Sequence, residues 1–198
     1  DVRAEELAGQ WIDEWVHGID GTDVRPGFIK TAVFPDPLAE TQVKIMTAAA
    51  IASRETGLTI GTHTCKGIPA LQIVRLLESQ RVDPAKWIFI HAHQEDDFDL
   101  VRMVADAGSW IELDGLGSAS DASILTSLLK LLDAGFERQV LLSHDAGWYT
   151  VGEPGGGAPR PYTHLTATFI PLMKQFGIED ETIATITVAN PARAFAIG

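Results

Sequence analysis

The sequence predicts an α/β protein built on a parallel β-sheet. Five short apolar segments recur at intervals of about 20 to 30 residues, and a segment with helical periodicity follows each of them. Strands that alternate with helices form parallel sheets, because each connection must cross back over the sheet. The strands are apolar nearly throughout, as expected where both faces are covered. Two architectures satisfy these observations: an open doubly wound sheet and part of a (β/α)8 barrel.

The N-terminal quarter contains the first strand between two helices. Residues 3–17 place Leu and Trp at every fourth position with acids on the other face, which predicts an amphipathic helix. Residues 28–33 follow a Pro-Gly pair and read as the first strand. Residues 39–56 are rich in alanine and predict a second helix, which Gly57 is expected to end in a left-handed conformation.

The strand–helix pattern then repeats along the rest of the chain. The further expected strands are residues 58–63, 87–92, 109–113 and 139–144. The further expected helices are residues 68–79, 96–107, 121–134 and 163–177, followed by a short terminal helix. Asp121 is a candidate N-cap for its helix. The glycine-rich residues 145–162 form a long loop.

Composition and charge restrict the classes of function. With 198 residues, 45% hydrophobic and 21% charged, the chain is expected to be a single globular domain over residues 1–198. A formal net charge of −12 argues against nucleic acid as a partner, because phosphate binding depends on Lys and Arg. No apolar run reaches the roughly 18 residues of a membrane span, and no signal peptide is visible. The single cysteine, Cys65, excludes an intrachain disulfide and fits a cytoplasmic location.

Ionisable residues gather at the carboxyl ends of the expected strands. They are Lys30, His63, His91, His93, Asp114, His144 and Asp145. In both candidate folds, active sites form at this edge of the sheet. A lone strand-end histidine is more often structural than a ligand, but here four of the five strands end in a histidine or an aspartate, and Lys30 lies in the first. Imidazole and carboxylate are good zinc ligands, so the pattern predicts a metal site.

Lys30 is the unusual member of this set, because an ammonium group binds no metal and is costly to bury. It could simply be paired with a nearby acid. Alternatively, it could react with carbon dioxide to form an anionic carbamate whose two oxygens bridge two metal ions. That reaction needs a neutral amine, and burial lowers the pKa of a lysine.

Five segments of the chain together resemble the phosphotriesterase family of the amidohydrolase superfamily. They are RPGFIKTAV with Lys30, IGTHT with His63, HQEDDFDL with His93, LLSHDAGW with Asp145, and the terminal ITVANPARAF. They occur in the family's order and span nearly the whole chain.

The resemblance implies a (β/α)8 TIM barrel that holds two divalent metal ions, commonly zinc, with manganese or cobalt as alternatives. It implies that a carbamate on Lys30 bridges the ions and that His63 and His93 hold the more exposed one. Asp145 would bind the more buried ion and act catalytically by taking up a proton. His91 would then lie in the core or behind the ligands.

The chain departs from the family pattern at its start. The family has eight strands, and its first carries a His-x-His pair that holds the buried ion. Only five β/α units are expected here, and His17 on the first helix cannot supply that pair. The chain is therefore expected to be the C-terminal five-eighths of a barrel. Strands one to three would come from a longer protein or from another chain. Without them the buried ion would lack two ligands.

The resemblance further implies hydrolysis of a small-molecule ester or lactone, with phosphotriester cleavage as a second activity. Trp148, Tyr149 and Asp114 are the predicted substrate-binding residues, although the two aromatic side chains could equally cap the barrel rim. Three alternatives stay open: a non-catalytic ligand-binding protein, an inactive fragment of the hydrolase, and a nucleotide-binding open sheet. The absence of a phosphate-loop motif weighs against the last. Assembly as a homodimer is also left open.

Overall fold

The five strands form one parallel sheet in which neighbours in sequence are neighbours in space. The computed structural model describes residues 2–197, and its strands are β1 (Ile29–Ala32), β2 (Ile60–His63), β3 (Trp87–Ile90), β4 (Trp110–Leu113) and β5 (Val140–Leu142). Their order is β1-β2-β3-β4-β5, and every pair is parallel. A doubly wound sheet reverses its order at a switch point, whereas each strand here continues in the same direction. This order confirms the expected barrel-type arrangement.

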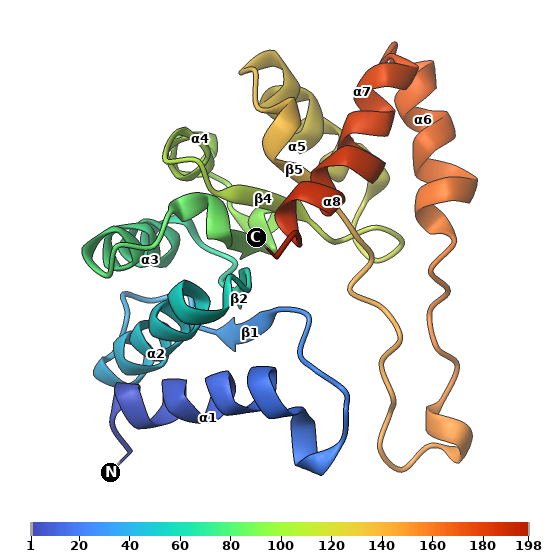
Figure 1. The fold of residues 1–198 in the computed structure, drawn as a ribbon. Helices are drawn as coiled ribbons and strands as arrows, with labels where there is room; N and C mark the ends of the chain where they lie inside the picture. The colour runs from blue at the N-terminus through green and yellow to red at the C-terminus, as the bar shows by residue number, and fades with distance from the viewer. Residues whose placement is uncertain (1, 198) are drawn as a thin grey trace.

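Helices follow the strands and lie around the outside of the sheet (Figure 1). The first five are α1 (Ala4–His17), α2 (Glu40–Thr56), α3 (Gly67–Ser79), α4 (Phe98–Asp106) and α5 (Asp121–Asp133). The C-terminal part contains a π-helix (Leu165–Phe169) that leads into α6 (Ile170–Gln175), then α7 (Asp180–Ala184), a second π-helix (Thr185–Ala189) and α8 (Asn190–Ala194). Within residues 2–197, no helix combines the length and the apolar character needed to cross a bilayer.

The two faces of the sheet carry separate apolar clusters. The outward-facing strand residues pack with the helices in the main core, which includes Ile60, Trp87, Phe89, Ile111 and Val140. The inward-facing residues form a smaller cluster that consists of Ile88, Ile90, Trp110, Leu141 and Ala194. Alternate strand residues point to opposite faces, so this division gives the sheet an interior side as a barrel has.

The third strand is shorter than expected, and this changes the geometry of its two histidines. β3 ends at Ile90, because His91 takes a left-handed backbone conformation with φ of 64° and Ala92–Gln94 form a 3₁₀ turn. The alternation rule holds only within a strand. The strand expected over residues 87–92 therefore stops two residues early, and strand alternation does not place His91 and His93 on one side.

One of the two expected helix-end signals is present. Gly57 ends α2 in the left-handed conformation with φ of 76°, as predicted. Asp121 is not an N-cap: Ser120 occupies that position and Asp121 is the first residue of α5. Its carboxylate instead lies 2.8 Å from Nε2 of His164.

The C-terminal segment is held against the beginnings of the strands by buried polar contacts. Nδ2 of Asn190 donates to the carbonyls of Glu137 and Val140, both at 2.7 Å. The hydroxyl of Thr59 donates to the carbonyl of Ala194. The NPARAF motif thus binds the start of β5 and closes the interior end opposite the strand-end histidines.

Candidate metal centre

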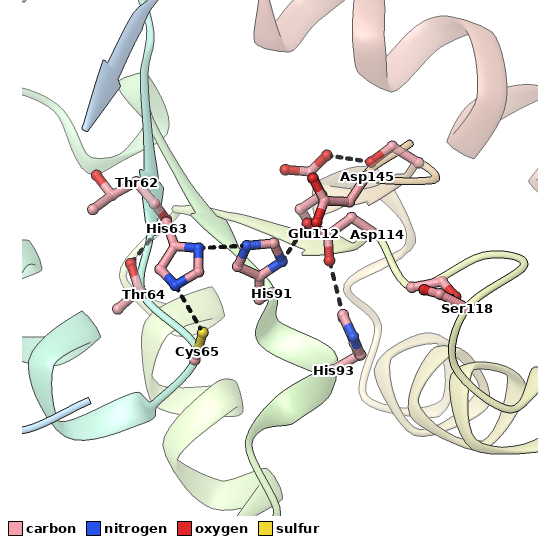
Figure 2. Close-up of polar contacts among 12 residues, drawn as sticks. Thr62, His63, Thr64, Cys65, His91, His93, Glu112, Asp114, Ser118 and Asp145 are labelled. Atoms are coloured by element: carbon pink, nitrogen blue, oxygen red, sulfur yellow. Dashed lines mark hydrogen bonds and ion pairs between the residues drawn. The ribbon is translucent and has the colours of Figure 1, made fainter. Parts of the chain in front are cut away.

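Histidines and carboxylates from β2 to β5 meet at the carboxyl edge of the sheet (Figure 2). His63 is the last residue of β2, and His91 directly follows β3. Asp114 directly follows β4, and Asp145 lies three residues beyond β5. The parallel strands run in matched register, with Ala32 beside His63 and His63 beside Ile90, so their carboxyl ends reach the same level.

His63 and His91 point their ring nitrogens at one another. Nδ1 of His63 lies 2.7 Å from Nε2 of His91, and the two rings are nearly perpendicular at 78°. The other nitrogen of His91, Nδ1, lies 2.6 Å from Oδ2 of the buried Asp114. A carboxylate that accepts from one ring nitrogen leaves the opposite nitrogen available to bind a metal, which is the usual arrangement around ligand histidines.

His93 contacts Asp114 separately from the row formed by His63, His91 and Asp114 (Figure 2). Its Nδ1 is 3.0 Å from Oδ1 of Asp114, but neither of these buried atoms makes a hydrogen bond. Its Nε2 faces the backbone of Gly115, where even a Cβ atom would approach to 2.9 Å. The structure therefore brings His91, rather than His93, next to His63; the ligand role predicted for His93 stays a prediction.

The close contacts in this cluster shift the pKa values of His63, His91 and Asp114. The hydrogen bond with Asp114 raises the pKa of His91. Burial, together with the positive charges of His91 and Lys30, lowers the pKa of His63. Burial opposes ionisation of Asp114, but the close contacts and charges of His91 and His93 outweigh it and lower its pKa. Asp114 is thus an ionised carboxylate engaged by two histidines, and its predicted contact with substrate stays a prediction.

Lys30 and Asp145 both line a cavity on the interior side of the sheet, together with Ile88 and Ile90. The cavity has a volume of about 190 Å³ and is also lined by Glu112 and Asp114. Nζ of Lys30 donates to the carbonyl of Thr31 at 3.1 Å. A second, more apolar cavity of about 670 Å³ runs from Lys30 and His63 towards α2. Lys30 thus lines both cavities, the first together with Asp145 and the second together with His63, and their predicted roles as metal ligands stay predictions.

Glu112 is a functional candidate that the sequence analysis missed. It faces the interior from the middle of β4 and accepts a hydrogen bond from Oγ of Ser143 at 2.8 Å. Burial and the neighbouring Asp114 raise its pKa from 4.5 to about 7. The signal was available, because alternation along β4 places this lone acid on the same face as Trp110.

Trp148 and Tyr149 lie on the long segment after Asp145 and are about two-thirds exposed. Nε1 of Trp148 donates to the carbonyl of Asp145 at 2.9 Å. The ring of Tyr149 packs against Gly156, where an added Cβ would lie 2.2 Å away. Both side chains contact their own segment, and their role in substrate binding stays a prediction.

The side chains present fit a metal centre in kind. Two imidazole nitrogens face each other, one of the two rings is held by a carboxylate, and a lysine and an aspartate line the adjoining cavity. In residues 2–197, no three histidine, cysteine, aspartate or glutamate side chains converge closely enough to hold an ion by themselves. The kinds of side chain therefore match the expected centre, but a complete set of ligands for an ion would need Lys30 or residues from elsewhere.

Comparison with known proteins identifies relatives over nearly the whole chain. The model of the phosphotriesterase family matches residues 1–195. An aryldialkylphosphatase from Saccharolobus solfataricus is 31% identical over 202 residues, which cover 96% of this chain and 64% of that protein. The chain thus spans less than two thirds of the length of this relative.

Solved structures show the same fold. An organophosphorus hydrolase from Deinococcus radiodurans is 31% identical, with a TM-score of 0.87 over 98% of this chain and 62% of its own. A protein in which organophosphate hydrolysis was engineered from a weak promiscuous lactonase template is 32% identical, with a TM-score of 0.87 over 98% of this chain and 64% of its own. These solved structures therefore share the fold of nearly the whole chain, and not only the order of its strands.

Proposed function

This chain belongs to the phosphotriesterase family, and we propose that it provides most of the active site of a metal-dependent hydrolase that cleaves esters or lactones. The observation that carries the proposal is the pair of ring nitrogens of His63 and His91, 2.7 Å apart at the carboxyl edge of the sheet. The relatives named for organophosphate hydrolysis and for a lactonase origin support this substrate range. Phosphotriester cleavage is the proposed second activity.

In this proposal, Lys30, His63, Asp145 and a histidine after β3 hold two divalent ions, with zinc as the first choice and manganese or cobalt as alternatives. Lys30 would do so as its carbamate. When bound, such ions supply Lewis-acid activation of water and of the substrate's carbonyl or phosphoryl oxygen. Asp145, which lines the interior cavity, would accept the proton released from water.

The histidine after β3 has two candidates, and the structure favours His91. Its Nε2 faces His63, whereas Nε2 of His93 faces Gly115. Asp114 then has a defined role, because it fixes the tautomer and the ring orientation of His91 by accepting from Nδ1. The HQEDDFDL segment assigns the ligand role to His93 instead, and the two assignments make opposite predictions.

Metal content decides between them. His63→Ala, His91→Ala and His93→Ala should be compared in protein expressed with any sequence encoded before Asp1, loaded with zinc or cobalt and measured by mass spectrometry. We expect His63→Ala and His91→Ala each to lower metal affinity by at least tenfold, and His93→Ala to have a smaller effect. His17→Ala is the matched control, because His17 is an exposed surface histidine paired with Asp13. Loss of metal in His93→Ala alone would restore the assignment from the sequence.

Hydrolysis tests the reaction itself. The metal-loaded protein should cleave aryl esters or lactones, and more slowly dialkyl aryl phosphates, and Asp145→Asn should abolish turnover while the protein stays folded. Lys30→Ala should reduce metal content, with partial rescue by short carboxylic acids. A metal-loaded protein that binds these compounds but turns over none of them would favour the non-catalytic alternative.

A further inference from the structure

The segment between β5 and the first π-helix leaves the sheet and returns to it beside Asp145. Residues 146–163, here called the arm, run outward from the end of β5 and back to the helix that leads into α6 (Figure 1). Glu153 and Gly156 lie in a short turn at its outer end, where the amide of Thr150 also donates to the carbonyl of Gly156. The arm is therefore a long loop whose two ends lie beside each other next to Asp145.

Donors from the arm, and from Leu165 just after it, reach three consecutive residues at its start, His144 to Ala146. The carbonyl of Asp145 accepts from Nε1 of Trp148 at 2.9 Å and also from the guanidinium of Arg160. The carbonyl of Ala146 accepts from the hydroxyl of Tyr162 at 2.9 Å. Nε2 of His144 accepts from the amide of Leu165 at 3.0 Å. The contacts thus converge on the backbone that carries the proposed proton acceptor.

The backbone of Asp145 needs such support. It has φ of 42°, a left-handed conformation that residues other than glycine adopt only when their surroundings enforce it. In the described part of the chain, the last sheet-type bonds beside Asp145 are those of Ser143, with Leu113 and Leu116. The sheet therefore ends two residues before Asp145, and the donors that reach its carbonyl come from the arm.

We propose that Arg160 is a positioning residue that, with Trp148 as a second donor, holds the main chain of Asp145 so that its carboxylate lines the interior cavity beside Lys30. The inference rests on the proposed function, in which Asp145 binds metal and accepts a proton. Arg160 is partly buried, and a charged donor forms a stronger hydrogen bond with a carbonyl than a neutral one does. Through these hydrogen bonds, residues of the arm fix the backbone of Asp145 and so the position of its carboxylate.

Kinetics of arm variants test this role. We expect Arg160→Ala to lower kcat on the order of tenfold or more with little change in KM, because the change acts on the proton acceptor rather than on substrate binding. Arg160→Lys should recover part of the loss, since an ammonium can still donate to one carbonyl. Val151→Ala is the control, because Val151 lies on the same arm and is 90% exposed.

A double-variant cycle separates positioning from simple folding of the arm. If Arg160 acts through Asp145, then Arg160→Ala should lower metal affinity in the parent and cause no further loss of metal affinity in an Asp145→Asn background. Equal losses in both backgrounds would overturn the inference, because Arg160 would then act independently of Asp145. If Asp145→Asn alone has no effect on hydrolysis or metal affinity, the proposed function fails instead.

The conformation of Asp145 provides a readout that does not need turnover. A crystal structure of the Arg160→Ala, Trp148→Phe double variant should show Asp145 outside the left-handed region, whereas Val151→Ala should retain it. A left-handed Asp145 in the double variant would overturn the inference, because its backbone would then be held without the arm.

Discussion

Glu112 should make the stability of the protein depend on pH in a direction opposite to that of most carboxyl groups. Its pKa rises from 4.5 to about 7 in the folded state, because of burial and the negative charge of Asp114. Below pH 4.5 the group is protonated in both states and has no effect. As the pH rises towards 7, the unfolded chain loses the proton while the folded chain keeps it, so the free energy of unfolding falls.

The magnitude follows from the size of the rise. A change from 4.5 to about 7 corresponds to at most about 3.5 kcal/mol at roughly 1.4 kcal/mol per pH unit. This is an upper limit, because part of the side chain reaches solvent. Glu112→Gln removes the charge and keeps an oxygen that can accept from Ser143. At pH 8 the variant should therefore unfold at a higher temperature, by up to about 7 to 14 °C for a chain of this size.

The assay is urea unfolding of metal-free protein between pH 4.5 and 8, followed by the fluorescence of the buried Trp87 and Trp110. The difference between Glu112→Gln and the parent should be near zero at pH 4.5 and grow through pH 7. Ser143→Ala is a useful companion, because loss of its hydrogen bond should raise the pKa of Glu112 further. A stability difference that stays constant across this pH range would refute the reasoning, since it would not arise from ionisation of Glu112.

Two further substitutions test the packing that supports the site. Asn190→Leu should lower the free energy of unfolding by about 2 to 5 kcal/mol, because the buried carbonyls of Glu137 and Val140 would lose their donor. Urea denaturation measures this loss, and a value below about 0.5 kcal/mol would contradict the expectation. Gly67→Ala should cost about 1 to 3 kcal/mol, because the added Cβ would lie 2.4 Å from Cβ of Leu100, and an unchanged thermal midpoint would show that α3 and α4 can move apart freely.

The sequence predicts the large-scale organisation because that organisation depends on repeated signals. Each strand is a compact apolar run followed by a helical pattern, and the parallel arrangement follows from that alternation alone. The chain order of the sheet confirms it. Lys30, His63 and Asp145 come to one region for the same reason, since matched parallel strands bring their carboxyl ends to one level.

What the sequence could not predict begins where each strand ends. Alternation along a strand assigns sides to residues only while the extended conformation continues. Cys65, His91 and Asp145 all take positive φ values just beyond β2, β3 and β5, and each turns the chain away from the strand direction. No local signal marks these turns, because a left-handed cysteine, histidine or aspartate is uncommon and depends on tertiary contacts.

The same feature explains why His91 and Asp145, rather than their neighbours, reach the site. A left-handed residue at a strand end redirects its side chain, so His91 meets both His63 and Asp114 while His93 is carried past Asp114. Such conformations cost free energy and persist where surrounding contacts enforce them. For His91 those contacts are the ones with His63 and Asp114. For Asp145 they are the hydrogen bonds that Trp148 and Arg160 of the arm donate to its carbonyl. Loss of the contacts should therefore change which side chains face the cavity, and not merely loosen it.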